Sequence, residues 1–292
     1  MSFKKLSEIT AISEDRKIPF WQVILEDDMK ERGVTREESM KTMGSMLDTI
    51  TEADAKYDAS IRSASGMAGG DGGKIEAFRM KGNSLIDGFI LEVIEKAVKM
   101  GESNACMKRI VAMPTAGSCG VIPAVLLTYI KHKNVERERI IEALYVAGGI
   151  GEVIATSASI SGAEGGCQAE IGSAGAMAAG ALAYLEGGGN EEIVHAAALT
   201  LKNMLGLTCD PVAGLVEVPC IKRNAAGAVN AVVYSQMAMA GVRSAIEPDE
   251  VIDSMNRIGR LLPSCLKETG QEGLAITKSA EKITERLSMS WQ

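Results

Sequence analysis

Three of the six cysteines lie in loops rich in glycine and proline, and they are the residues with the clearest potential for chemistry. Cys167 follows the segment ISGAEGG, while Cys209 and Cys220 flank the segment DPVAGLVEVP. Each lies at an expected helix boundary, where free backbone amides and the helix dipole stabilise thiolates. A single free cysteine is most often a buried packing residue. The context that these three share makes them candidates for a common role as ligands.

The other cysteines lack that context. Cys106 is flanked by helix-like sequence, and Cys265 lies beside proline and serine without neighbouring glycine. We expect neither to be a ligand. Cys119 lies inside the glycine-flanked loop MPTAGSCG, where it could support the loop without binding a metal.

Three thiolates without a suitable histidine favour an iron–sulfur cluster over zinc. A structural zinc site needs a fourth protein ligand. His132 lies in a Lys-His-Lys turn and His195 in an amphipathic helix, and neither context matches a base with an orienting acid. A [4Fe-4S] cluster tolerates three cysteines and leaves one iron open as a Lewis acid for a substrate hydroxyl and carboxylate. The spacing matches no ferredoxin motif, so the residues alone leave simple packing open as well.

Two further loops could seat an anionic group. The loop MPTAGSCG, residues 113–120, leads into an expected helix, so its small hydroxyls and free amides should face one space suited to a carboxylate or phosphate. The loop LPSCLKETGQEGLA offers a lysine. We predict Ser118 and Lys267 as candidate catalytic residues. The predicted substrate contacts are Thr115, Ser118, Gly120 and Lys267.

Helical periodicity must position these loops, and it predicts an all-α fold. Apolar residues recur at helical spacing from residue 85 to 98, with Gly101 as the expected C-terminal cap. A second such run is expected to open at Asn190 and close at Gly206. Thr35 and Glu38 form a capping box ahead of a polar helix that reaches about residue 55. Further helices are expected at 119–132, 136–155, 168–187, 224–245 and 249–261.

The expected organisation is an N-terminal helical arm, residues 1–60, followed by one helical iron–sulfur catalytic domain, residues 61–292. The segment SASGMAGGDGGK separates the two, and its GGDGGK stretch matches neither a phosphate loop nor a dinucleotide-binding motif. The chain has 31 glycines, many of them inside helical segments. Glycine weakens a helix by about 1 kcal/mol relative to alanine. So many of them indicate close helix packing or backbone wrapped around a ligand.

Composition excludes several classes of protein. The net charge of −7 and pI of about 5.2, with interspersed charges and 4% aromatic residues, argue against nucleic-acid binding. The N-terminus lacks the pattern of a signal peptide, and no apolar run approaches the ~20 residues of a membrane span. We therefore expect a cytoplasmic protein, in which the cysteines are thiols or ligands rather than disulfides.

Four motifs together resemble the iron–sulfur-dependent L-serine dehydratase (L-serine ammonia-lyase) family, in particular its α chain. They are MPTAGSCG, SGAEGGCQAEIG, LTCDPVAGLVEVPCIKRNA and LKETGQEGLA, and they occur in the family's order within about residues 60–280. The resemblance implies a [4Fe-4S] cluster held by Cys167, Cys209 and Cys220. It also implies conversion of L-serine to pyruvate and ammonia, with the open iron activating the hydroxyl as a leaving group.

The resemblance further implies a second chain. Single-chain relatives carry an additional N-terminal domain, whereas two-chain relatives have it as a separate β subunit. This chain corresponds to the α part, so we expect a heterodimer or a larger αβ assembly. The partner could supply the base that removes the Cα proton, which agrees with the lack of plausible histidine bases here.

Alternatives remain at this level. A pyridoxal-phosphate enzyme could perform the same elimination, with Lys108 or Lys267 forming the imine, although a nearly all-helical chain argues against it. The same fold could act on L-threonine or a β-thio amino acid, because one methyl group changes binding by only about 1–3 kcal/mol. The third alternative is a non-catalytic helical domain, in which the cysteines only pack or bind zinc as a redox sensor.

Overall fold

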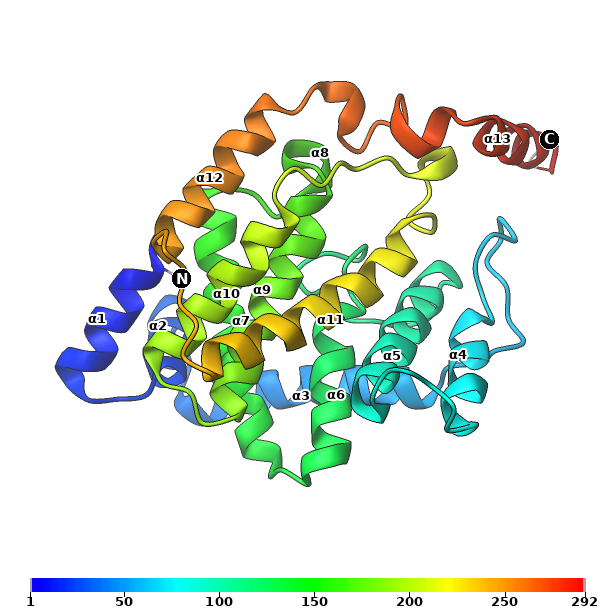
Figure 1. Ribbon diagram of the computed structural model, residues 1–292. Helices are drawn as coiled ribbons and strands as arrows, with labels where there is room; N and C mark the ends of the chain where they lie inside the picture. Colours follow the sequence, from blue (N-terminus) through cyan, green and yellow to red (C-terminus); the bar gives the residue numbers. More distant parts are fainter. Residues whose placement is uncertain (1, 291–292) are drawn as a thin grey trace.

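The computed structural model describes residues 2–290, and within them all regular structure is helical, as expected for an all-α protein (Figure 1). The helices before the first candidate cysteine are α1 (Leu6–Arg16), α2 (Phe20–Arg32), α3 (Arg36–Ala55), α4 (Asp71–Met80), α5 (Gly88–Ala105), α6 (Val121–Lys133), α7 (Arg137–Ser157) and α8 (Gly162–Gly165). Then come a short π-helix η1 (Gln168–Gly172), α9 (Ser173–Leu185), α10 (Asn190–Met204), η2 (Val212–Gly214), α11 (Cys220–Met239), α12 (Pro248–Leu261), η3 (Ser264–Leu266), η4 (Gly273–Ile276) and α13 (Lys278–Ser290).

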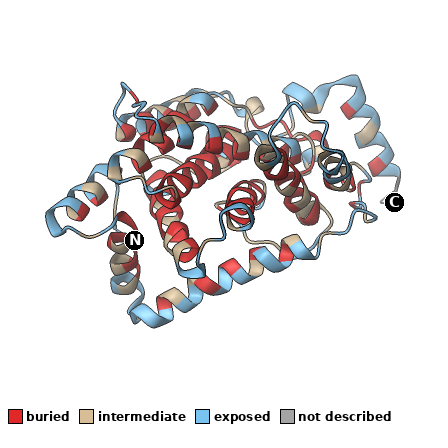
Figure 2. Cartoon of the chain, turned by 60° about the horizontal axis from the view of Figure 1, so that its bottom comes forward, coloured by how far each residue is buried: buried red, intermediate tan, exposed pale blue. Residues whose placement is uncertain are grey.

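Helix α9 lies at the centre of the fold. Every residue of its sequence SAGAMAAGALAYL is buried, and it packs against α6, α7, α10 and α11. A helix that is apolar on all sides is expected to be enclosed by others. Its small residues permit close approach: a Cβ atom on Gly180 would lie only 2.2 Å from Ile150 Cδ1 of α7. Figure 2 shows the buried residues concentrated in the central helices, with exposed residues around them.

Helix α7 has an apolar character that its position in the core explains. By length and composition alone it could span a membrane, and among the described residues it is the one helix that meets that test. In the folded chain 67% of its apolar window is buried. It contacts α9 on one side and α2 and α3 on others.

The first 60 residues contribute to the core as well as to the surface. Helix α2 packs against α7, and its side chains Phe20, Ile24 and Leu25 are almost fully buried. The predicted capping box of α3 is confirmed, because the Glu38 N–H donates to Thr35 Oγ1 at 3.2 Å and the Thr35 N–H donates to Glu38 Oε2 at 2.9 Å. The division of the chain into an arm and a catalytic domain stays a prediction.

The predicted limits of two helices are wrong, and packing explains the difference in one of them. Helix α5 continues through Gly101 to Ala105. This glycine has a packing role instead of a capping role: a Cβ atom on it would lie 3.2 Å from Ile221 Cγ2 of α11, so glycine lets the two helices approach. Helix α11 spans Cys220–Met239 rather than 224–245. It ends just before Gly241, which has a φ of +89° and so turns the chain out of the helix. The predicted limits of α10 agree with the structure, since Gly206 follows its end.

The glycine-rich segment 63–74 lies between α5 and the loop that carries two candidate cysteines, and hydrogen bonds link it to both. Glu102 of α5 is buried, and its carboxylate accepts hydrogen bonds from the backbone N–H groups of residues 69, 71 and 72, at 3.2, 2.8 and 3.1 Å. It thereby caps α4 from a neighbouring helix. Within the same segment, Ser63 and Ser65 each donate at 2.7 Å to Glu217, a buried residue of the cysteine loop.

We predict that Glu102→Gln lowers the free energy of unfolding by about 2–3 kcal/mol, because an amide replaces a charged acceptor and its NH₂ group faces backbone donors. Urea unfolding measures the loss, and faster hydrogen exchange at residues 69–72 should accompany it. Glu52→Gln, which alters an exposed i,i+4 ion pair with Lys56, should leave the free energy of unfolding almost unchanged, because water screens exposed ion pairs. Equal losses in the two variants would contradict this role for Glu102.

Candidate functional site

The structure brings the three candidate cysteines into one buried region. Cys167 directly precedes η1, Cys209 lies in the loop after α10, and Cys220 is the first residue of α11. Each is at most 7% exposed, and all are free thiols. Burial raises the pKa of Cys167 to about 11 and that of Cys220 to about 12. Burial also raises the pKa of Cys209, and the other two sulfurs add to the rise. The three thiols are therefore close enough to interact electrostatically.

Their arrangement differs from that of a mononuclear metal site. Among residues 2–290, no group of three or more His, Cys, Asp or Glu side chains is placed to hold a metal ion. Cysteines that hold a [4Fe-4S] cluster bind separate iron atoms and stand further apart than the ligands of one zinc ion. Thiols must also lose their protons on binding. Three buried, mutually interacting thiols without a histidine among them fit cluster ligation better than zinc.

An arginine side chain accompanies the thiols. The positive charge of Arg223, in α11, opposes the rise that burial produces in the pKa of the Cys167 thiol. Its guanidinium also donates to the Thr208 carbonyl at 2.8 Å and forms an ion pair with Asp210 Oδ1 at 2.9 Å. The other oxygen of Asp210 accepts the Leu274 N–H at 3.0 Å. Arg223 and Asp210 thus join two of the cysteine segments to the C-terminal loops.

A half-buried carboxyl group that sequence reasoning missed lies beside the thiols. Glu170 belongs to η1, and π-helical turns are frequent at functional sites. Its Oε1 accepts a hydrogen bond from Thr115 Oγ1 at 2.8 Å. Burial raises the pKa of Glu170, the Thr115 hydroxyl opposes that rise, and Glu268 adds to it. The motif SGAEGGCQAEIG contains this residue three positions after Cys167, but nothing local distinguishes it from a surface glutamate.

The predicted anion seat is mostly occupied by internal hydrogen bonds. Thr115 and Ser118 have their hydroxyls 3.1 Å apart, and Ser118 is fully buried. The Gly120 amide is not free as expected, because it donates to Asn224 Oδ1 at 2.8 Å. Asn224 also donates to the Gly117 and Cys220 carbonyls, at 2.7 and 2.9 Å. The loop therefore braces the start of α11, while substrate contact by Ser118 and Gly120 stays a prediction.

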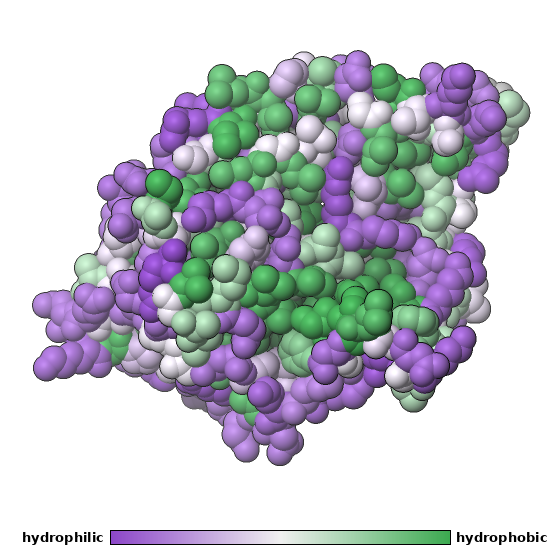
Figure 3. All heavy atoms as spheres, in the orientation of Figure 1, coloured by the Kyte–Doolittle hydropathy of each residue, from purple (hydrophilic) through white to green (hydrophobic). Residues whose placement is uncertain are grey.

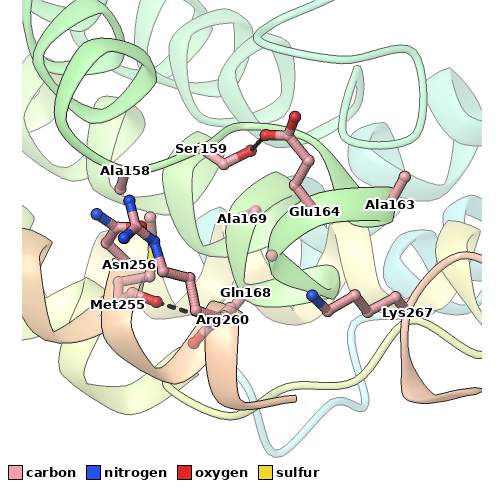
Figure 4. A pocket seen from close by; sticks show the side chains of 12 residues that line it. Ala158, Ser159, Ala163, Glu164, Gln168, Ala169, Met255, Asn256, Arg260 and Lys267 are labelled. Atoms are coloured by element: carbon pink, nitrogen blue, oxygen red, sulfur yellow. Dashed lines mark hydrogen bonds between the residues drawn. The ribbon is translucent and has the colours of Figure 1, made fainter. Parts of the chain in front are cut away.

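Lys267 lines a separate cavity. A hollow of about 380 Å³ lies between α8, η1 and α12, and none of the three candidate cysteines is on its wall. Figure 4 shows the Lys267 ammonium pointing into this hollow, with Arg260 on another side. Glu164 turns toward Ser159, which donates to it at 2.7 Å. The backbone beside Lys267 reaches the cysteine region, because the Cys209 N–H donates to the Leu266 carbonyl at 3.0 Å, but its side chain lines this hollow. A catalytic role for Lys267 stays a prediction.

The histidines and remaining cysteines have structural surroundings. His132 pairs with Glu92 at 3.1 Å, and the His195 ring accepts the Ser244 N–H at 3.2 Å. Burial raises the pKa of Cys119 to about 12. Cys106 and Cys265 are half-buried, at the end of α5 and in η3. None of these residues therefore belongs to the candidate ligand set.

We predict that Arg223→Met lowers the free energy of unfolding by about 3–5 kcal/mol, because Asp210 would remain buried without its cation. Lys222→Met is the matched control: the adjacent lysine is half-exposed and pairs with Asp71 at 2.7 Å, so its loss should cost less than about 1 kcal/mol. Urea unfolding of both variants provides the comparison. A loss at Arg223 no larger than that at Lys222 would show that the buried pair does not hold the loops together.

Comparison with known proteins agrees with the motifs. A family model described as serine dehydratase alpha chain matches residues 15–275. The chain is 45% identical over 285 residues to the probable L-serine dehydratase, alpha chain, of Bacillus subtilis strain 168, covering 98% of this chain and 95% of that protein. It is 39% identical over 277 residues to the L-serine dehydratase, alpha chain, of Peptoniphilus asaccharolyticus, covering 94% and 95%.

A longer relative matches only part of the chain. The L-serine dehydratase of Streptomyces coelicolor is 46% identical over 182 residues, which are 62% of this chain and 40% of that protein. The family model and the two full-length relatives together cover the candidate cysteines and the helices around them. The chain therefore belongs to the serine dehydratase alpha-chain family.

Proposed function

We propose that this chain is the α part of an enzyme that deaminates L-serine to pyruvate and ammonia, using a [4Fe-4S] cluster held by Cys167, Cys209 and Cys220. The observation that carries the proposal is the convergence of these thiols in one buried region of a chain from this family. When bound, such a cluster supplies an iron with a free coordination position, which is a Lewis acid for the substrate hydroxyl.

The chain's own residues would prepare that chemistry. Arg223 places a positive charge beside Cys167, which favours the thiolate form that ligation requires. Asp210 fixes the guanidinium, and the buried setting keeps bulk water away from the reacting groups. Burial also strengthens the electrostatic interactions between the protein and a bound zwitterion.

We further propose a β partner chain that supplies the base for the Cα proton. Both full-length relatives are named alpha chains, which implies a second chain. Both histidines of this chain make contacts away from the candidate cysteines, so neither is placed to act as the base. Large apolar side chains such as Leu85, Met107 and Leu261 are exposed, as is common where a partner binds. Figure 3 shows apolar side chains gathered across the middle of one face. We place the assembly in the cytoplasm.

We predict that Cys167→Ala, Cys209→Ala and Cys220→Ala each abolish bound iron and serine deamination together, because each removes a cluster ligand. Cys106→Ala, which changes a half-buried thiol at the end of α5, should keep both. Anaerobic purification with iron and acid-labile sulfide analysis provides the measurement. Full iron content in any of the first three variants would refute the ligand assignment. A yellow protein that borohydride inactivates would instead indicate pyridoxal phosphate.

Turnover by the assembled enzyme should identify the substrate. We expect deamination of L-serine to exceed that of L-threonine and L-cysteine in kcat/KM, measured as ammonia or 2-oxo acid release under anaerobic conditions. A preference for L-threonine or L-cysteine would change the substrate while leaving the ligand set intact. No turnover of any of the three by iron-loaded enzyme would contradict the proposed activity.

A further inference from the structure

Glu170 is a carboxyl group near the thiols that has no cationic partner. It is half-buried, and no lysine, arginine or histidine of residues 2–290 forms an ion pair with it. Within residues 2–290 its one hydrogen-bond donor is Thr115, whose Oγ1 donates to Oε1 at 2.8 Å. The second oxygen, Oε2, receives no donor from the described part of the chain. A carboxylate that is partly removed from water and has no compensating charge is unfavourable, so its presence requires a reason.

Two glycines bring this carboxylate close to the cysteines. A Cβ atom on Gly162 would lie 2.7 Å from Glu170 Oε2 and 3.2 Å from Cys209 Sγ. A Cβ on Gly117 would lie 3.2 Å from Glu170 Oε1. Side chains at these positions would therefore push the carboxylate away from the thiol. Glu170 Oε2, the oxygen without a donor, and the sulfur of Cys209 therefore both lie next to Gly162.

An amino-acid substrate could supply the positive charge that Glu170 lacks. An α-amino acid enters as a zwitterion, so a site that receives its hydroxyl and carboxylate must also receive an ammonium group. Arg223, the cation beside the thiols, is already bound to Asp210. Glu170 offers the complementary negative charge, and Thr115 fixes its orientation through the other oxygen. A charge-assisted hydrogen bond of this kind discriminates strongly between an ammonium group and a neutral hydrogen atom.

We propose that Glu170 binds the ammonium group of the amino-acid substrate and so selects amino acids over the corresponding 3-hydroxy acids. This inference rests on the proposed deaminase function, and it assigns Glu170 to substrate binding rather than to removal of the Cα proton.

The test compares two unreactive ligands that differ only in the ammonium group, L-alanine and propanoate. Both are titrated calorimetrically into the assembled, iron-loaded enzyme. For Glu170→Gln we expect affinity for L-alanine to fall about 10- to 100-fold, while affinity for propanoate stays within about twofold. In steady-state kinetics the KM for L-serine should rise more than kcat falls. Iron content, sulfide content and the unfolding midpoint should match those of the unaltered enzyme.

Glu164→Gln is the matched control, because Glu164 lies on the same α8–η1 segment but faces the separate hollow beside Ser159. It should bind both ligands as the unaltered enzyme does. If Glu170→Gln does not load iron, Thr115→Val provides a milder test, with a smaller loss confined to L-alanine.

Unchanged affinity for L-alanine in Glu170→Gln would overturn the inference, as would equal losses for the two ligands. A fall in kcat with an unchanged KM would assign Glu170 to proton transfer instead and would equally overturn it. These results leave the deaminase proposal intact. That proposal fails separately if the unaltered, iron-loaded enzyme turns over none of the amino acids.

Discussion

The structure around the thiols depends on one half-buried cation, Arg223. Its guanidinium contacts the Thr208 carbonyl and Asp210 on either side of Cys209, and its charge acts on the Cys167 thiol. Three buried thiols repel one another once they ionise, and a positive charge among them reduces that repulsion. Because Arg223 lies in the first turn of α11, its position is set by the same helix that begins at Cys220.

A second set of polar contacts fixes the loop between Cys209 and Cys220. Glu217 of this loop is held by two serine hydroxyls from the glycine-rich segment 63–74, and that segment is in turn held by Glu102 of α5. Each carboxylate is buried and satisfied by several donors, as buried charges generally must be. A segment that looks like a linker in the sequence therefore supports the candidate site from outside.

Glycine allows these contacts to form at short range. The core helices approach closely through residues such as Gly180, and the thiol region contains Gly117 and Gly162 where a Cβ atom would meet Glu170. The first role of glycine here is close helix packing, and the second is to leave room for a carboxylate beside a thiol. Backbone wrapped around a ligand stays a prediction. The proposed ammonium contact depends on the second role, because a larger residue at Gly162 would occupy the space between the carboxylate and Cys209.

The sequence by itself determined the helical architecture, because apolar periodicity and capping residues act locally: Thr35 caps α3 with Glu38, and α10 ends before Gly206. It also singled out the three cysteines, since all lie in glycine- or proline-containing loops at helix boundaries. Only the tertiary structure decided that Gly101 is a packing residue, that the Gly120 amide is occupied, and that Glu170 lies beside the thiols. The reason is that burial and charge are created by residues distant in the chain, as when Thr115 meets Glu170, and no local pattern encodes such a meeting.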